Sequence, residues 1–349
     1  MARRWKIKQK PQDFVVREVI FDEVEASWKE KYGQLHGKHP ERDSRYLWFT
    51  LKKTDQDFFT VIGSVARKLK LGVRDIGYAG TKDRHAITYQ TISVPAEKED
   101  AVSSLDIPGL EVSNFRYRNR AIKLGEHKGN DFEITVRNIQ DSEIPALEKR
   151  IENVRRKGMI NYFGGQRFGS VKNANDSIGK MLVIDDIQGA VRKIMEGGGK
   201  YEKAASVYLK KKPGDYAGVL RQLPLRLLRL FLHAYQARIW NECARRYSGR
   251  NTAIPIVGHK IDVRNYPRIR KILEEVLEHE KIDARDFRNH SFIELSSRGT
   301  ERDYIVVPKH LEYEFADDEM NSGKKKLIMS FFLPKGSYAT EVVRQLSEN

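Results

Sequence analysis

One short segment places a carboxylate between fixed positive charges, a pattern that an active site could use. In GYAGTKDRHAITYQ, residues 77–90, Asp83 lies between Lys82 and Arg84. Either cation would lower the pKa of the carboxyl group and keep it ionised. An ionised aspartate beside a sugar can act as a nucleophile or stabilise an oxocarbenium-like centre. For these three residues alone, however, a solvated turn with a surface carboxylate is the better explanation.

A second segment, NYFGGQRFG at residues 161–169, gathers aromatic and polar side chains between three glycines. They are Tyr162, Phe163, Gln166, Arg167 and Phe168. Aromatic rings stack on bases and arginine pairs with phosphate, so this segment could contact a nucleic acid. An aromatic core strand broken by a tight turn would have the same composition. The residues by themselves do not decide between the two interpretations.

The remaining reactive residues predict no metal site and no cofactor. The close histidine pair, His36 and His39, lies in a loop with glycine and proline and has no cysteine nearby. Phosphate-binding GxxxxGK[ST] loops, strand-linked GxGxxG motifs and GxSxG motifs are absent. Residues 197–199, three glycines, follow a helical pattern and are expected to end that helix. Cys243 falls within another helical pattern, where an inert thiol is expected.

The composition predicts a basic globular protein. The 349 residues include 64 Lys and Arg against 48 Asp and Glu, giving a net charge of +16. This excess favours a polyanionic partner, because each phosphate contact releases condensed counterions; a merely basic enzyme is the alternative. With no bilayer-spanning apolar run, no signal-type segment and one cysteine, we expect a cytoplasmic protein that binds no membrane. No heptad seam is present, so we expect a monomer.

The first half of the chain is expected to alternate strands with short helices around Asp83. The expected strands are residues 10–19, after an initial turn, 46–51, 86–94 and 132–136. Asp57 should cap a helix whose apolar positions from Phe58 to Leu69 share one face and which Gly72 closes. A second helix is expected over residues 144–157. The charged segment 25–45, with its glycines and proline, is expected to be a loop or insertion.

After Gly169 the pattern becomes helical. Residues 173–247 read as mostly helical and end in a long helix over 225–247, and a shorter amphipathic helix covers 269–277. The long helix carries Arg226, Arg229 and Arg238, which could contact RNA, although at least one is expected to form a structural ion pair. Strand patterns return at 304–308 and 327–333.

These patterns predict an α+β protein with a helical module inserted into it. The ends of the chain are rich in strands and its middle is helical, which favours an insertion over two domains in tandem. We place the discontinuous domain at residues 1–172 and 303–349, and the insertion at residues 173–302.

Five segments together resemble the TruD family of tRNA pseudouridine synthases. They are KIKQKPQDFVVRE (6–18), GTKDRHAITYQ (80–90), LGEHKGNDFEITVR (124–137), NYFGGQRFG (161–169) and SFFLPKGSYATEVVRQL (330–346). They follow the family's order over most of the chain. The resemblance implies a pseudouridine-synthase fold with a mixed, mainly antiparallel central sheet, and an inserted, mostly helical domain of the TRUD type.

The resemblance also implies the reaction. A uridine in RNA, expected at position 13 of tRNA, is isomerised to pseudouridine without a cofactor, and DNA is not a substrate. The N1–C1′ bond breaks, the uracil turns over, and C5 rejoins the ribose. The base must leave its stack, which requires a basic surface and an aromatic pocket.

By the same resemblance, the family's catalytic aspartate falls on Asp83. The residues expected to bind the substrate are Lys8, Lys82, Arg84, Asn130, Phe132, Tyr162, Arg167 and Phe331. Asn130 and Phe132 match the segment that holds and stacks the target base, and Phe331 matches an aromatic that closes the pocket. Each aromatic could instead be a core residue.

The sequence departs from the family's pattern at Gln12, where relatives often have glutamate. A role for a second carboxylate at that place is therefore in doubt. Two alternatives to the leading function remain. The same chemistry could act on another tRNA position or another RNA, or the chain could be a non-catalytic RNA-binding protein. The intact Lys82–Asp83–Arg84 motif argues against a pure binder, which has no need for the carboxylate.

Overall fold

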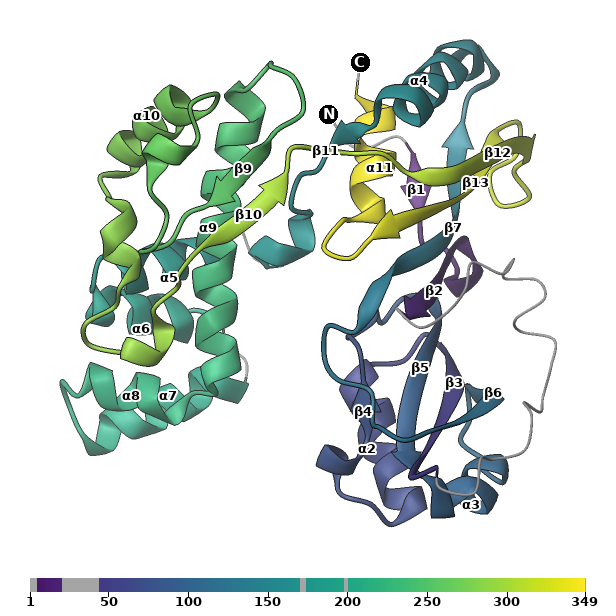
Figure 1. Cartoon of the computed structure of the whole chain (residues 1–349), viewed down its shortest axis with the longest axis horizontal. Coiled ribbons are helices and arrows are strands. Elements are labelled where there is room, and N and C mark those ends of the chain that lie inside the picture. Colours follow the sequence, from purple (N-terminus) through teal and green to yellow (C-terminus); the bar gives the residue numbers. More distant parts are fainter. Residues whose placement is uncertain (1–4, 21–43, 170–173, 198–199, 349) are drawn as a thin grey trace. The chain divides into compact units, whose positions relative to one another are not determined.

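The computed structural model describes residues 5–20, 44–169, 174–197 and 200–348. Its chain divides into two compact units (Figure 1). Unit 1 comprises Met1–Gly158, Val307–Ala339 and Val343–Asn349, and unit 2 comprises Met159–Val306 and Thr340–Val342. The expected loop at 25–45, apart from its last two residues, lies outside the described residues, as do His36, His39 and two of the three glycines at 197–199.

Unit 1 is built on one mixed sheet with the strand order β12-β13-β7-β2-β5-β3-β6. The strands are β2 (Phe14–Ile20), β3 (Tyr46–Thr54), β5 (Ile87–Pro95), β6 (Leu110–Arg118), β7 (His127–Ile139), β12 (Lys309–Asp317) and β13 (Lys325–Pro334). Short β1 (Lys6–Ile7) and β4 (Gly77–Tyr78) pair with β7 and β5. Among the described strands of this sheet, only β2 and β5 pair in parallel. The sheet is therefore mixed and mainly antiparallel, as expected.

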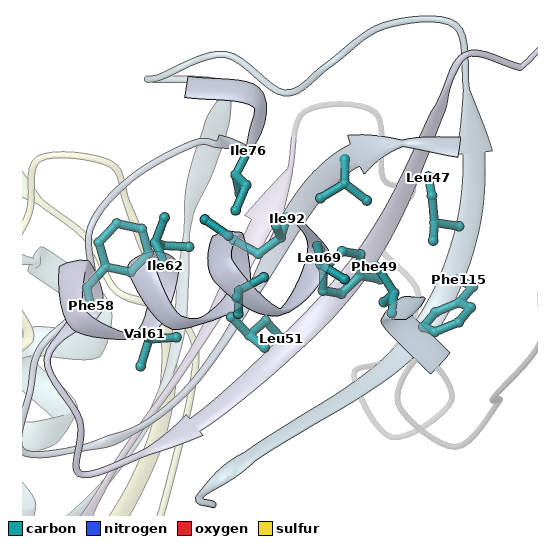
Figure 2. Close-up of a cluster of buried hydrophobic side chains, with 14 residues drawn as sticks. Leu47, Phe49, Leu51, Phe58, Val61, Ile62, Leu69, Ile76, Ile92 and Phe115 are labelled. Atoms are coloured by element: carbon teal, nitrogen blue, oxygen red, sulfur yellow. The ribbon is translucent and has the colours of Figure 1, made fainter. Parts of the chain in front are cut away.

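One face of the sheet carries a hydrophobic core under helix α2 (Phe58–Leu69), shown in Figure 2. The buried side chains of α2 recur at helical spacing and pack on inward residues of β3 and β5. Asp57 accepts a hydrogen bond from the Thr60 amide at 2.9 Å and caps the helix as expected. The helix ends earlier than predicted, at Lys70 rather than Gly72, because Lys70 itself adopts the left-handed conformation with φ of 53°.

The described part of unit 1 also includes the helices α3 (Glu99–Ser103), α4 (Ile144–Lys157) and most of α11 (Ala339–Ser347). Helix α4 has the bounds that the sequence predicted. Its buried positions, Leu147, Ile151 and Val154, follow the helical period. Strands β6 and β12 were not predicted, although Leu311, Tyr313 and Phe315 of β12 alternate with polar residues.

Unit 2 is mostly helical. Its helices are α5 (Ala174–Val183), α6 (Ile187–Met195), α7 (Lys200–Lys211), α8 (Tyr216–Gln222), α9 (Leu225–Arg246) and α10 (Arg270–Glu280). Helix α9 is central, because its residues from Phe231 to Ala244 are largely buried. Burial raises the pKa of the Cys243 thiol to about 12, which makes it the inert thiol that the sequence predicted.

Two short strand pairs complete unit 2. Strand β8 (Met159–Ile160) pairs with β11 (Ile305–Val306), and β9 (Ala253–Ile256) pairs with β10 (Thr300–Asp303). Phe163 packs edge-on against Trp240 of α9, with ring centroids 5.6 Å apart. The unit therefore begins at Met159, before the boundary at 172/173 expected from the sequence. Strand pairing and aromatic packing attach the NYFGGQRFG segment to the helices.

One of the basic residues on α9 is structural, as expected. Arg238 forms ion pairs with Asp176, at 3.2 Å, and with Glu280. No helix among the described residues is long and apolar enough to cross a membrane. Within the same residues, no group of three or more His, Cys, Asp or Glu side chains could hold a metal ion.

Candidate active site

Asp83 lies in the loop between β4 and β5, and its ion partner comes from the N-terminal segment. The Lys8 Nζ donates to Asp83 Oδ2 at 2.7 Å. Asp83 Oδ1 has no hydrogen-bond partner among the described residues, and the Asp83 side chain is 32% exposed. One carboxylate oxygen is thus held in place while the other is available to a substrate.

The local geometry of Lys8 is set by tertiary structure. Lys8 has a φ of 57°, a left-handed conformation that is uncommon outside glycine. Its ammonium lies 4.0 Å from the centroid of the Phe14 ring, within the range of a cation–π contact. The side chain is only 18% exposed, so both the aromatic ring and Asp83 compensate its charge.

Neither Lys82 nor Arg84 forms an ion pair with Asp83 among the described residues. Lys82 forms its ion pair with Glu18 of β2, and both side chains are nearly inaccessible, at 6% and 0% exposed. Glu18 also accepts from the Thr91 amide. The Arg84 side chain is exposed and makes no hydrogen bond or ion pair with another described residue.

Lys53 of β3 contacts the same loop and was missed by sequence reasoning. It is 1% exposed, and its Nζ donates to the Asp83 backbone carbonyl at 2.5 Å. Burial lowers the pKa of Lys53 to about 8, and the charge of Lys82 adds to this, while Asp83 opposes it. The sequence contained a signal for this burial. In the strand YLWFTLKKT, Lys53 alternates with Phe49 and Leu51 on the face that points into the core, which is an unusual position for lysine.

Asn130, Phe132 and Glu18 share one face of the sheet. Phe132 pairs with Val16 across β7 and β2, and Asn130 pairs with Glu18. Directly opposed residues in an antiparallel pair point to the same face. The Asn130 Oδ1 is buried and has no hydrogen-bond partner in the described chain, so it can accept from a ligand.

Phe132 and Phe331 lie opposite each other on β7 and β13, with ring centroids 5.7 Å apart. Phe132 also packs edge-on against Phe14 at 6.1 Å. Phe132 is 8% exposed and Phe331 only 2%. The three rings form a small aromatic cluster next to Lys8, and Phe132 is the more accessible of the two expected base contacts.

Further buried polar atoms without partners line this face. They are Thr88 Oγ1, Gln90 Oε1 and His127 Nδ1. Thr88 pairs in parallel with Val16, which places it and Gln90 on the face of Glu18. Burial and the charges of Lys82 and Lys335 lower the pKa of His127, so its ring is neutral at pH 7. Orphaned polar groups are costly in a core and indicate a place where a polar ligand or water binds.

A buried arginine anchors the segment that carries Lys8. Arg137 of β7, 1% exposed, donates to Asp13 from Nε at 3.0 Å and from Nη2 at 2.8 Å. Asp13 Oδ2 in turn accepts from the amides of Gln9 and Lys10, at 3.0 and 3.2 Å. Gln12, where the sequence departs from the family's pattern, is exposed. The carboxylate that organises this loop is Asp13.

Tyr162 and Arg167 belong to unit 2. Phe163, between them in sequence, is 7% exposed and part of the core of that unit. Residues Gly165–Phe168 form a 3₁₀ turn that carries Arg167. Phe163 therefore fits the interpretation of this segment as aromatic core. Arg167 is half-buried and its Nε is buried without an acceptor, so it is the residue of this segment that could still contact a nucleic acid.

The fold as a whole is that of a known enzyme class. A crystal structure described as "Putative tRNA pseudouridine synthase D (TruD)" from Methanosarcina mazei matches with a TM-score of 0.73 and 25% identity. The match covers 98% of this chain and 93% of that one. The protein thus has the α+β pseudouridine-synthase fold that the sequence predicted.

Sequence comparison identifies the family. The family described as tRNA pseudouridine synthase D (TruD) matches residues 4–205, 193–254 and 249–346. The chain belongs to this family and is an RNA pseudouridine synthase, an isomerase. Relatives named "Probable tRNA pseudouridine synthase D" are 28% identical in Thermococcus onnurineus and 29% identical in Thermococcus gammatolerans. Each alignment covers 99% of this chain and 95% of the relative.

Proposed function

We propose that this protein converts uridine 13 of tRNA to pseudouridine, with Asp83 as the catalytic group and without a cofactor. The observation that carries the proposal is the Asp83 carboxylate, which is partly exposed and held through one oxygen by Lys8 at 2.7 Å. Family membership supports tRNA as the substrate class, since the curated relatives are named as tRNA pseudouridine synthases.

Asp83 acts directly on the nucleoside in this proposal. Its Oδ1, which has no protein partner in the described chain, either attacks as a nucleophile or stabilises positive charge at C1′ while the N1–C1′ bond breaks. The uracil then turns over and C5 bonds to C1′; if Asp83 has attacked C1′, the Asp83–C1′ bond breaks in this step and the carboxylate is restored. The C5 proton is lost as N1 gains one. Lys8 holds Oδ2 and thereby fixes the direction of Oδ1.

The base and its flanking phosphates need separate contacts. Asn130, with its buried acceptor, is suited to hydrogen-bond the uracil edge, and Phe132 to stack on it. Arg84, exposed and without a protein partner in the described chain, is suited to a phosphate. Lys82 acts through its ion pair with Glu18, and Phe331 supports the Phe132 ring. The remaining proposed substrate contacts are Lys8, Tyr162 and Arg167.

Unit 1 is proposed as the catalytic domain, because it contains Asp83, Lys8 and Asn130, and unit 2 as the inserted domain. We also propose that the protein works as a monomer in the cytoplasm, where its tRNA substrate is found, and that it does not use DNA.

Unmodified tRNA transcripts test the function. The protein is incubated with transcripts that carry either uridine or cytidine at position 13, and pseudouridine is mapped at nucleotide resolution. Conversion that requires uridine 13 is the expected result. Conversion elsewhere would overturn the assignment of the position while leaving the chemistry intact. Binding without any conversion would overturn the catalytic proposal and favour an RNA-binding protein.

A further inference from the structure

Unit 2 contains a cationic cavity that includes one proposed substrate contact, Arg167, and lies outside the group formed by Asp83, Lys8 and Asn130. Its volume is about 260 Å³, and it is lined by residues of α9, by the segment before α5 and by the loop that leads into β10. Its charged or ionisable lining residues are Arg167, His233 and Arg298, and none of the described residues that line it is a carboxylate. A cavity with this lining is suited to an anion.

The loop that presents Arg298 is held by several specific contacts. Gln236 of α9, 3% exposed, donates to the Val257 carbonyl at 2.5 Å and to Ser297 Oγ at 2.8 Å. The Lys260 amide donates to the Arg298 carbonyl at 3.1 Å. Gly299 has a φ of 82°, and a Cβ there would lie 2.7 Å from the Ile256 carbonyl oxygen. The cavity wall is therefore preorganised.

The arginines near this cavity differ in their partners. Arg302 is structural, because it donates to the carbonyl and the side-chain oxygen of Asn161 at 2.8 and 2.7 Å. By contrast, the side chains of Arg167 and Arg298 donate no hydrogen bond and form no ion pair within the described chain. The Arg167 Nε is buried, and its guanidinium lies 5.8 Å from the centroid of the Phe163 ring. A buried N–H of a charged group without an acceptor is costly. A ligand oxygen in the cavity would offset that cost.

The size and charge of the cavity narrow the ligand class. Guanidinium groups recognise phosphate oxygens through two parallel hydrogen bonds. Without a carboxylate in the cavity lining, no protein anion competes with the phosphate for these groups. A volume of 260 Å³ equals about nine waters, enough for one phosphate with its ribose and too little for a large cofactor. Desolvation and the charges of Arg167 and Arg229 lower the pKa of His233, so at pH 7 its neutral ring supplies a donor rather than a charge.

We propose that this cavity binds a backbone phosphate of the RNA substrate, at a nucleotide other than the one that is converted. The inference rests on the proposed function, because it takes RNA as the substrate. It assigns unit 2 a direct role in holding the RNA, through Arg167 and Arg298.

Binding of an unmodified tRNA transcript to the full-length protein tests the proposal. Arg167→Gln and Arg298→Gln should each raise Kd about tenfold. Each should also reduce the magnitude of the log Kd against log salt slope by about 0.7 to 0.9, the loss of one phosphate contact. Arg285→Gln is the matched control, since Arg285 is 87% exposed in the same unit and pairs with Asp283. It should change neither quantity.

Several outcomes would overturn the proposal. One is that both variants bind like Arg285→Gln. Another is that the variants lose affinity for inorganic phosphate but not for RNA, which would make the cavity a site for a free anion. Arg167→Gln could weaken binding by unfolding, so thermal melts accompany each measurement. In that case Arg298→Gln still tests the proposal, because Arg298 is exposed on its loop and its replacement should not unfold the protein. Failure of the proposed function would be seen in a different measurement. In that case the wild-type protein would form no pseudouridine, whatever affinity the cavity variants have for tRNA.

Discussion

At the scale of the residue, the candidate chemistry depends on one carboxylate with two distinct oxygens. Asp83 Oδ2 is committed to Lys8, and Oδ1 is not committed to any described residue. The Asp83 backbone carbonyl is held by Lys53. The side chain and the main chain of the same residue are thus fixed by two lysines, one from the loop after β1 and one from β3, which limits the directions that the reactive oxygen can take.

Asp83→Asn should abolish catalysis and preserve RNA binding. The amide is nearly isosteric, but it is a poor nucleophile and cannot stabilise positive charge at C1′. We expect single-turnover formation of pseudouridine at saturating enzyme to fall by at least about a thousandfold. Affinity for tRNA should be unchanged or higher, because the substitution removes a negative charge from a site that must accept phosphates. Asp106→Asn, an exposed aspartate of the same unit, is the control. A rate for Asp83→Asn near that of the parent would contradict the assignment.

Lys53→Met should change how stability depends on pH. The pKa of Lys53 is about 8 in the folded protein and about 10.5 when unfolded, so the unfolded chain binds more protons between these values. The free energy of unfolding contributed by Lys53 therefore rises with pH across this window, by up to about 3 kcal/mol. Urea unfolding of parent and variant at pH 7.5, 9 and 10.5 measures the difference. Parallel pH profiles for the two proteins would show that Lys53 is not perturbed.

At the scale of the element, the loop between β1 and β2 is fixed by a network that begins on β7. Arg137 donates to Asp13, which holds the amides after Lys8, and also to Asp318 at 2.8 Å. Strand β7 lies between β2 and β13 in the sheet, so one arginine connects the N-terminal and C-terminal segments. A buried cation with several carboxylate partners is costly to break, because removal of one partner leaves charge uncompensated.

Asp318→Asn should lower the free energy of unfolding of unit 1 at neutral pH and have a smaller effect in acid. Burial opposes ionisation of Asp318, but amide hydrogen bonds from Asn138 and Met320 outweigh it and lower the pKa. The stabilisation is therefore present above about pH 4, the ordinary range of an aspartate, and is lost as pH falls below it. We expect a cost of about 3–5 kcal/mol at pH 7 and a smaller one at pH 3, measured by urea unfolding.

Its neighbour Asp317 provides the control, since Asp317 is 92% exposed and pairs only with Lys325 among the described residues. Asp317→Asn should have little effect at either pH. Equal costs for the two variants at pH 7 would show that the network around Arg137 does not stabilise the fold.

At the scale of the whole molecule, the excess of positive charge is the dominant property. A net charge of +16 supplies a sequence-independent attraction to any nucleic acid, while we propose that the site in unit 1 supplies the chemistry. Most of the affinity for tRNA should then come from phosphate contacts rather than from the flipped base.

The affinity for tRNA should fall steeply with salt. With on the order of four or more phosphate contacts, the slope of log K against log salt should be about −3 or steeper. Fluorescence anisotropy between 50 and 300 mM salt measures it, and thermal melts over the same range establish that the fold is intact. A slope near zero would contradict a binding surface built from phosphate contacts.

The sequence by itself determined much that is local. The helical period of apolar residues predicted α2, α4 and α9, and the β-branched run after Asp83 predicted β5. The five motifs, in order, predicted the family and the fold, which comparison confirmed. These properties follow from short-range periodicity and from matching residue types, and both can be read along the chain.

Only the tertiary structure decided the partners of the charged groups. Lys8 and Asp83 are 75 positions apart, and Lys53 and Asp83 are 30 apart. No local pattern distinguishes them from Lys82, which pairs with Glu18 instead. The choice depends on the parallel pairing of β2 with β5 and on the position of β3 beside them. Ion pairs between strands depend on register, and register is set by the packing of the whole sheet rather than by neighbours in sequence.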